Sequence, residues 1–380
     1  MQELFTGPKR EASLTVTHKY GPCFQSNKDQ LLVLNHTELL LQDQSRVNSI
    51  HSMFSKNSDG NKLRESQATT IPAKSGLSID SGNYIVTVGL GTPKTDQTLA
   101  FDTGSDLTWA QCKPCERQCY KQVDPIFDPS KSTSYTNISC PTPLCTQLTS
   151  STRETTTKAL QWHCRVARPR SRPSFPCATS RSKYSQFFSY CLPSTTSSTG
   201  YLILGKGSEI SSSLKFTPML TLSQRQSFYG LNLIGLSVGG QRLSIPTSVF
   251  STAGTIIDSG TVITRLPPTA YNALRTKFRE MMRNYPMTSA TSPFDTCYDL
   301  SKSQSVSIPS ISFFFGGDVS VDLGEVGILY VLRQTEACLA FAGNSDPRYI
   351  TIFGNEQQKG LEVVYDVAGE RIGFRPGGCS

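Results

Sequence analysis

Two short motifs of the same design constrain this chain more than any other feature of its sequence. In the first, an apolar stretch within residues 99–109 leads into an aspartate, a hydroxyl residue, glycine and a second hydroxyl residue: Asp102, Thr103, Gly104 and Ser105. Glycine lets the backbone turn tightly beside the carboxylate, and the hydroxyls can hydrogen-bond the carboxylate or fix the turn. A single copy also makes an ordinary turn, so by itself it does not establish a site.

The second copy lies in residues 254–262, where apolar residues again precede an aspartate, a hydroxyl residue, glycine and another hydroxyl residue: Asp258, Ser259, Gly260 and Thr261. Two matched loops in one chain suggest two related lobes, each presenting one carboxylate. A pair of carboxylates is suited to general acid–base chemistry.

The length of 380 residues allows one to three domains with a large core. No run of about 18 apolar residues is present, so we expect no membrane span. The 12 cysteines and the glycosylation sequons at Asn35 and Asn137 fit an oxidising compartment. Because residues 1–10 contain no apolar secretory segment, we infer that a signal peptide is missing from this sequence and expect a secreted, extracellular or vacuolar protein.

The net charge of +8 is concentrated in one stretch. Residues 153–183 hold six Arg, two Lys and one Glu, a net charge of +7, which leaves about +1 for the rest of the chain. No aromatic residues alternate with these arginines in a pattern typical of RNA-binding segments. We therefore expect no nucleic-acid partner.

Residues 1–78 are polar and poor in strand signals, and only Val47, Ile50 and Phe54 recur at helical spacing. A helix is therefore expected there. The region is either a solvated tail or a prosegment that covers a cleft, and its position ahead of a clear strand favours the prosegment.

From residue 82 the chain alternates in the manner of β-strands, and a helix is expected after Pro267, with Leu274 and Phe278 on one face. The pattern predicts an all-β chain with a few helices: a first lobe at 79–205, a connection at 206–227 and a second lobe at 228–380. Strands are expected at 83–91, 97–101, 184–191, 201–205, 229–238, 308–315, 328–332, 338–342, 350–355, 361–366 and 371–374.

Residues 151–183 show no helix or strand period, and Pro169, Pro173 and Pro176 interrupt any run. We expect this stretch to be disordered or irregular. Its two cysteines, Cys164 and Cys177, are expected to have no reliable partner.

Five cysteines follow the first motif in a Pro- and Ser-rich context: Cys112, Cys115, Cys119, Cys140 and Cys145. A zinc site is conceivable. No histidine lies near them, however, so a disulfide-stapled loop is favoured, and neither a metal nor a cofactor is expected.

These features together resemble the pepsin-like aspartic proteases, and among them the plant nepenthesin-like group. The resemblance covers nearly the whole chain except 151–183. It is carried by the two aspartate motifs, the cysteine-rich insert and three further segments: 102–105, 258–261, 112–145, 7–23, 188–193 and 371–379.

The resemblance implies a bilobal β fold in which Asp102 and Asp258 share one water, and one proton, in the cleft between the lobes. It implies an endopeptidase acting on peptide or protein substrates, made as a zymogen and secreted to the apoplast or vacuole, and we expect a monomer. Ser105 and Thr261 are expected to hydrogen-bond the outer carboxylate oxygens. Gly104 and Gly260 belong to the same two loops.

Other expectations depend on the same resemblance. Thr103 and Ser259 should tie the two loops together, and the nearby Asp106 is assigned a structural role. Disulfides are expected at Cys191–Cys379 and Cys297–Cys338, with Cα–Cα distances of about 4.4–6.8 Å. Trp109 stands where relatives place the tryptophan that hydrogen-bonds a tyrosine of the flap, a β-hairpin that closes over the substrate.

The chain departs from the family in the first lobe. No flap tyrosine motif is present, since Tyr135 lies upstream of the flap position. Relatives brace each aspartate loop with an apolar-apolar-Gly strand, and this chain keeps one at 352–354, whereas 202–205 comes too late in the first lobe. Residues 151–183 therefore resemble foreign sequence, from a wrong reading frame or missing exons. The alternative is a non-catalytic relative that binds peptides or inhibitors.

Overall fold

The structure is a computed structural model of the whole chain. It describes the following residues: 12–18, 36–55, 82–105, 108–115, 119, 122–136, 163–166, 186–195, 197–205, 213–222 and 228–379.

The described residues are rich in β-structure. The strands are β1 (Ala12–His18), β2 (Tyr84–Leu90), β3 (Thr95–Ala100), β4 (Thr108–Gln111), β5 (His163–Val166), β6 (Phe187–Cys191), β7 (Thr199–Leu204), β8 (Lys215–Leu220), β9 (Tyr229–Leu231), β10 (Leu233–Val238), β11 (Gln241–Arg242), β12 (Thr255–Ile257), β13 (Thr264–Leu266), β14 (Cys297–Asp299), β15 (Ile311–Phe315), β16 (Val319–Asp322), β17 (Leu329–Arg333), β18 (Glu336–Leu339), β19 (Phe341–Gly343), β20 (Thr351–Phe353), β21 (Leu361–Asp366) and β22 (Arg371–Pro376). The helices are α1 (His36–Ser55), α4 (Ser248–Ser251) and α5 (Pro268–Met281), with 3-10 turns η1 (Pro129–Lys131), η2 (Glu325–Gly327) and η3 (Asn355–Gln358).

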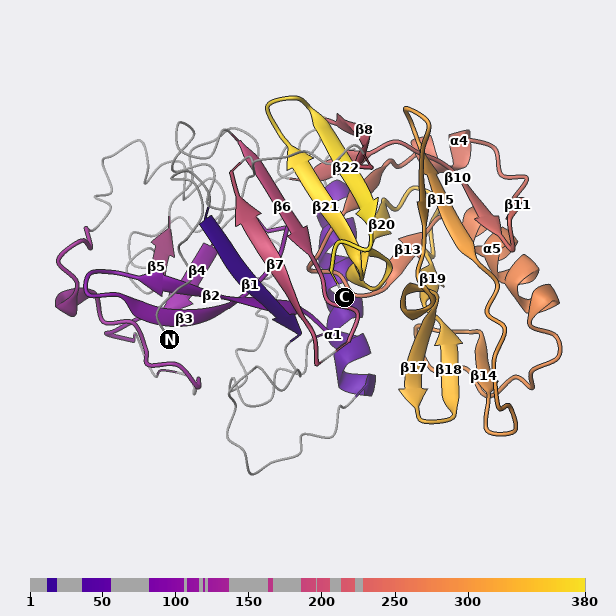
Figure 1. Cartoon of the computed structure of the whole chain (residues 1–380), viewed down its shortest axis with the longest axis horizontal. Helices are drawn as coiled ribbons and strands as arrows, with labels where there is room; N and C mark the ends of the chain where they lie inside the picture. Colours follow the sequence, from indigo (N-terminus) through magenta and orange to yellow (C-terminus); the bar gives the residue numbers. More distant parts are fainter. Residues whose placement is uncertain are drawn as a thin grey trace.

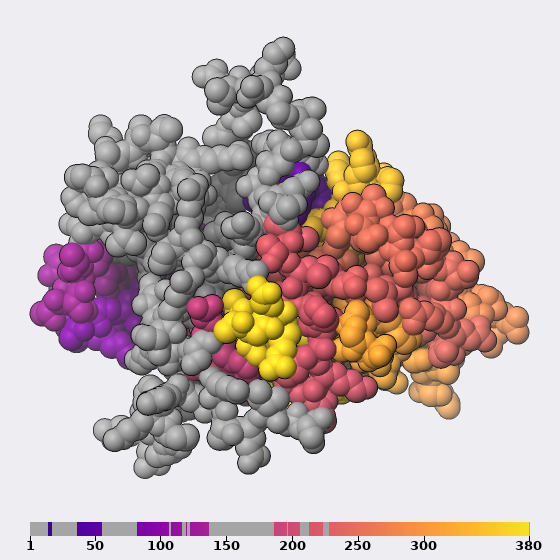
Figure 2. Space-filling model, turned by 90° about the horizontal axis from the view of Figure 1, so that it is seen from above, coloured from indigo at the N-terminus to yellow at the C-terminus, as the bar shows by residue number. Residues whose placement is uncertain are grey.

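One sheet of 13 strands runs through both lobes in the order β19-β13-β20-β12-β9-β8-β22-β21-β6-β7-β1-β2-β3. In Figure 1, strands β1–β5 and β7 lie on one side of α1 and strands β10, β11 and β14–β19 lie on the other. Seen from above, residues 84–136 (purple) and the orange part of the second lobe stand at opposite ends of the molecule (Figure 2). None of the described helices is long and apolar enough to cross a membrane.

Helix α1 packs its apolar face against the second lobe. Leu39 and Leu40 share a buried cluster with Val262 and Ile263, and Val47 and Ile50 share another with the strands before and beside the second aspartate. The buried positions recur every three or four residues, as on one face of a helix. The expected helix is therefore present, and it begins earlier than the apolar spacing indicated.

The N-terminal region also supplies a strand that the sequence reading missed. β1 pairs antiparallel with β2 and with β7, and so completes the sheet of the first lobe. Its sequence alternates Leu14 and Val16 with threonines, and Val16 is fully buried. The description of residues 1–78 as poor in strand signals was wrong here, because this alternation is a strand pattern.

Two other regions are more regular than expected. Within 151–183, residues His163–Val166 form β5, which pairs with β4, and the rest of that stretch lies outside the described residues. The expected connection at 206–227 contains β8, which pairs with β9 and β22. β5 pairs with β4 and β8 pairs with β22, segments that are distant in the sequence and that local periodicity does not reveal.

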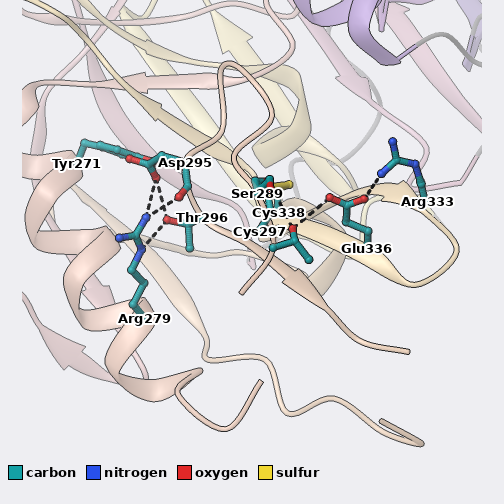
Figure 3. The surroundings of a disulfide bond; sticks show 10 residues. Tyr271, Arg279, Ser289, Asp295, Thr296, Cys297, Arg333, Glu336 and Cys338 are labelled. Carbon is teal, nitrogen blue, oxygen red and sulfur yellow. Dashed lines mark hydrogen bonds and ion pairs between the residues drawn. A yellow bond between two sulfur atoms is a disulfide. The ribbon is translucent and has the colours of Figure 1, made fainter. Parts of the chain in front are cut away.

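Disulfides join Cys191 to Cys379 and Cys297 to Cys338. Figure 3 shows the Cys297–Cys338 bond and the nearby Asp295. Asp295 accepts a hydrogen bond from Tyr271 and forms an ion pair with Arg279. The Cα–Cα distance is 5.9 Å in the first pair, but 3.9 Å in the second, shorter than expected. Cys297 and Cys338 lie directly opposite each other on the paired strands β14 and β18, which brings their Cα atoms close.

Candidate active site

The second aspartate loop is held by strands on both sides. It follows β12, which pairs antiparallel with β9 and parallel with β20. The Asp258 backbone N–H donates to the Phe353 carbonyl at 3.1 Å. Gly260 N–H donates to Asp258 Oδ1 at 3.0 Å, and Thr261 Oγ1 donates to Oδ2 at 2.6 Å. The Asp258 side chain is completely buried.

The first aspartate loop repeats these contacts around Asp102. Gly104 N–H donates to Asp102 Oδ1 at 2.9 Å, and the Ser105 hydroxyl donates to Oδ2. The loop follows β3, which pairs with β2 only, at the end of the 13-stranded sheet as far as the described residues extend. The Asp102 side chain remains 14% exposed.

The two loops are tied together by a reciprocal pair of hydrogen bonds. The Thr103 N–H donates to Ser259 Oγ at 3.0 Å, and the Ser259 N–H donates to Thr103 Oγ1 at 2.9 Å. Ser259 Oγ donates in turn to the Phe101 carbonyl at 3.2 Å. Each hydroxyl thus fixes the opposite backbone, which sets the separation of the two carboxylates.

Glycine is required in both loops because each faces the opposite carboxylate. A Cβ added at Gly104 would stand 2.6 Å from Asp258 Oδ1, and one added at Gly260 would stand 2.3 Å from Asp102 Oδ1. Both distances are well below van der Waals contact, so any side chain would separate the carboxylates.

Arg46 of α1 reaches into the space between the two carboxylates. Its Nη2 lies 2.6 Å from Asp102 Oδ1 and 2.9 Å from Asp258 Oδ2, and its Nη1 donates to Asp102 Oδ2 at 2.8 Å. Its Nε donates to Asp258 Oδ2 at 3.1 Å. Because one nitrogen bonds both aspartates, the carboxylates can be no farther apart than the sum of those two bonds, which is within the range of strong coupling.

The two carboxyl groups differ in their pKa. Burial alone would raise the pKa of Asp102, but the Arg46 guanidinium and the Ser105 hydroxyl lower it below its ordinary value. Burial raises the pKa of Asp258, and the neighbouring negative charge of Asp102 raises it further, although Arg46 opposes both. In the α1-bound form, Asp102 is therefore the more acidic of the two.

Comparison with known proteins places this geometry in a family. An aspartyl protease family protein of Arabidopsis thaliana is 48% identical over 97% of this chain and 88% of its own length. The chain belongs to the pepsin-like aspartic proteases, in their plant nepenthesin-like group. Aspartic proteinase nepenthesin-2 of Nepenthes gracilis is 32% identical over 88% of this chain and 83% of its own length.

Two family descriptions match the two lobes of this aspartic protease family member. Xylanase inhibitor N-terminal matches residues 84–169, and Xylanase inhibitor C-terminal matches residues 228–376. The crystal structure of edgp aligns with a TM-score of 0.59 at 16% identity, over 78% of this chain and 92% of that chain, which shows a common fold.

Of the remaining candidate residues, the structure describes Trp109 and three cysteines of the insert. Trp109 is on β4 with 49% of its side chain exposed. Cys115 and Cys119 form a disulfide and Cys112 is disulfide-bonded as well, so these three are not zinc ligands. The described residues contain no group of three metal-binding side chains. The others lie outside the described residues: Asn35, Asp106, Asn137, Cys140, Cys145 and Cys177.

The sequence reading missed two functional residues of α1. Arg46 precedes Val47 and stands on the buried face, and Asp43, one turn earlier, is 4% exposed. The available signal was a pair of charged residues on the apolar face of a predicted helix. Charged residues at such positions often extend their heads to water, so the signal did not identify a partner.

Proposed function

We propose that this chain is the α1-covered zymogen of an aspartic endopeptidase, in which Asp102 and Asp258 hydrolyse a peptide bond once α1 has left. The observation that carries the proposal is the convergence of both carboxylates on one nitrogen of Arg46. A guanidinium in that position excludes both a bridging water and a substrate carbonyl. The covered site is therefore inactive, and its two carboxylates are already placed for catalysis.

With α1 displaced, the two carboxyl groups share one proton, because like charges this close do not both ionise at low cost. The ionised group takes a proton from a water molecule as the water oxygen attacks the peptide carbonyl carbon. The protonated group donates its proton to the carbonyl oxygen. The tetrahedral intermediate then loses its C–N bond: the amine nitrogen takes a proton from the protonated group of the dyad, and one hydroxyl of the intermediate returns its proton to the ionised group as the carbonyl re-forms. No cofactor enters these steps.

We further propose that turnover by this chain is low, because its sequence contains no flap tyrosine motif. The alignment with the 48% identical relative spans 418 positions against 380 residues here, so the relative has at least 38 positions that this chain lacks. Positioning of reactants contributes about 7–11 kcal/mol to catalysis. Loss of a third of that lowers the rate by about two orders of magnitude.

The proposal includes a peptide or protein substrate, a monomeric enzyme, and a secreted or vacuolar location with glycosylation at Asn35 and Asn137. The disulfides Cys191–Cys379 and Cys297–Cys338 are consistent with an oxidising compartment.

The test uses the full chain, because removal of residues 1–78 would also remove β1 from the sheet of the first lobe. Hydrolysis of a denatured protein at acid pH is compared with and without pepstatin, for this chain and for one with a relative's flap segment grafted between Cys145 and Tyr184. We expect weak pepstatin-sensitive hydrolysis that rises about 100-fold on grafting. Asp102→Asn and Asp258→Asn serve as inactive controls.

A second candidate function is peptide or inhibitor binding without catalysis. Both matching families are described as xylanase inhibitors rather than as proteases, which favours keeping a function without catalysis. Tight peptide binding by the grafted chain, without hydrolysis, would support this candidate and contradict the endopeptidase. Turnover equal to that of an intact relative before grafting would contradict the low rate instead.

A further inference from the structure

A second carboxylate of α1 occupies a ready-made site in the second lobe. Asp43 Oδ1 accepts the Val262 N–H at 2.7 Å. Its Oδ2 accepts the Ile263 N–H at 3.4 Å and lies 2.9 Å from Arg265 Nη2. Two backbone donors and one guanidinium thus surround one carboxylate, an arrangement that gives strong, charge-assisted hydrogen bonds.

These donors belong to the second lobe and stay when α1 leaves. Val262 and Ile263 directly follow the Asp258 loop, and Arg265 is in the middle of β13, with 2% of its side chain exposed. Arg265 also donates to Gln44 of α1 and to the Ile263 carbonyl, and its Nε has no hydrogen-bond partner within the described residues. Among those residues, Asp43 is the one carboxylate paired with it.

When α1 leaves, the Arg265 guanidinium therefore loses Asp43, the carboxylate that balances its charge. A buried guanidinium without a partner is unfavourable, so the site gains by binding another carboxylate. A phosphate would bring more oxygens than the three donors are arranged to serve, whereas Asp43 shows that a side-chain carboxylate fits.

We infer that, in the uncovered enzyme, Val262 N–H, Ile263 N–H and Arg265 form a subsite for an acidic side chain of the substrate. The inference rests on the proposed function, because it names the substrate class of the same cleft. Arg265 is a specificity-determining residue in this scheme, and Asp43 occupies its subsite in the zymogen as Arg46 occupies the dyad.

The position of the subsite follows from the geometry of α1. Asp43 and Arg46 are three residues apart, which is about 4.5 Å along a helix. An extended peptide advances about 3.3 Å per residue. The acidic residue should therefore lie one or two residues from the scissile bond.

The test uses the full chain with Asp43→Ala and Arg46→Ala, which removes the α1 carboxylate from the subsite and the α1 guanidinium from the dyad, at pH 6, where glutamate is ionised. Internally quenched peptides are compared in pairs that differ only by Glu or Gln, at each position up to two residues from the scissile bond. We expect kcat/KM to be at least 10-fold higher for Glu at one position. Arg265→Gln should abolish that preference, Arg265→Lys should retain part of it, and Arg348→Gln, an exposed arginine in the same lobe, should leave it unchanged.

Binding of the same peptides to the chain with Asp43→Ala, Arg46→Ala and Asp258→Asn is measured by calorimetry as a readout independent of hydrolysis. Glu-selective binding that Arg265→Gln removes, without cleavage by the parent chain, would sustain the subsite and contradict the endopeptidase. Cleavage with no Glu preference at any position would overturn the subsite and leave the proposed function standing. Because the Glu and Gln peptides are compared on one chain, poor folding of Arg265→Gln does not prevent the decision.

Discussion

The two aspartate loops have the same sequence design and nearly the same internal hydrogen bonds, but their supports differ. Asp258 follows a strand that lies between β9 and β20, and its side chain is fully buried. Asp102 follows β3, which has a partner on one edge only within the described residues. The first loop obtains its remaining support from Thr103, which bonds the opposite loop, and from Arg46.

The difference shows that the four-residue motif sets the local turn, whereas neighbouring strands set how firmly the turn is held. Two further hydrogen bonds hold the second loop. The Gly354 N–H, which directly follows β20, donates to Thr264 Oγ1 of β13, and the Asn355 side chain of η3 donates to the Ser259 carbonyl. The first loop depends in addition on contacts with the opposite loop and with Arg46 of α1. Removal of α1 should therefore loosen Asp102 more than Asp258.

The largest expected effect is on the brace of the second loop. Phe353 is 1% exposed and its ring packs against Phe313 with centroids 5.0 Å apart. Phe353→Ala should lower the free energy of unfolding by about 3–5 kcal/mol. Leu99→Ala, on the partly buried edge strand of the first lobe, should lower it by about 1–2 kcal/mol. Guanidinium unfolding followed by fluorescence measures both, and equal losses would mean that the lobes are equally braced.

The next effect concerns Arg46, which contacts both carboxylates. Truncating one partner of such a hydrogen-bonded charge pair costs about 2–5 kcal/mol. In Arg46→Ala, we expect amide hydrogen exchange in residues 95–105 to accelerate at least about 10-fold more than in residues 255–261. The physical reason is that β12 keeps both of its strand partners while β3 has only one.

Two further variants control this experiment. Arg46→Lys keeps the charge but has no planar fork to reach both carboxylates, so its effect should be intermediate. Ser49→Ala, at an exposed position of the same helix, should change neither region. Equal acceleration around both aspartates in Arg46→Ala would contradict the unequal support.

A smaller effect distinguishes the two disulfides. Cys191–Cys379 closes 188 residues and joins β6 to the end of the chain, whereas Cys297–Cys338 closes 41 residues inside the second lobe (Figure 3). Each should contribute about 2–4 kcal/mol, and the longer loop about 1 kcal/mol more. Both cysteines of one disulfide are replaced by alanine, and urea unfolding of each double variant shows which disulfide contributes more to the free energy of unfolding. A larger loss for the shorter loop would show that local packing outweighs loop length.

Much of this architecture can be read from the sequence because it is local. The aspartate motifs specify their own turns, the alternating strands of the second lobe specify their own faces, and Pro268 with its apolar periodicity specifies α5. The contacts of Ser105 and Thr261 with the carboxylates also follow from short spacing, since each is three residues from its aspartate.

The remainder depends on partners that are far apart in the sequence. Arg46 and Asp258 are separated by 212 residues, and Asp43 and Arg265 by 222. The local sequence around an arginine in a strand, or around a charged pair on a helix, does not identify the residue that each charge contacts. β1 is different, because its alternation was visible and its polar surroundings concealed it.

The last expected effect depends on pH and concerns His51, which lies on the buried face of α1. Its Nε2 is 3.3 Å from the Ile350 carbonyl and its ring stacks on Tyr349. Burial lowers the pKa of His51 to about 4, the Ile350 carbonyl opposes this shift, and the positive charge of Arg265 adds to it. The docked helix therefore holds a neutral His51, whereas a released helix would have a histidine of ordinary pKa, near 6.5.

The sign of the pH dependence follows from these two states. Above about pH 6.5 neither state binds the proton and docking of α1 is at full strength. Between about 6.5 and 4 only the released helix binds it, so each unit of acidification weakens docking by up to about 10-fold. His51→Phe keeps a ring against Tyr349 and removes the titration, so α1 should be released at a lower pH. Hydrogen exchange of residues 36–55, corrected for intrinsic rates, measures release, with Ser49→Ala as the control. Acidification also protonates Asp258 beside Arg46, so the pH dependence of α1 docking should be weaker in His51→Phe but still present. An unchanged pH dependence in His51→Phe would exclude His51 as a contributor.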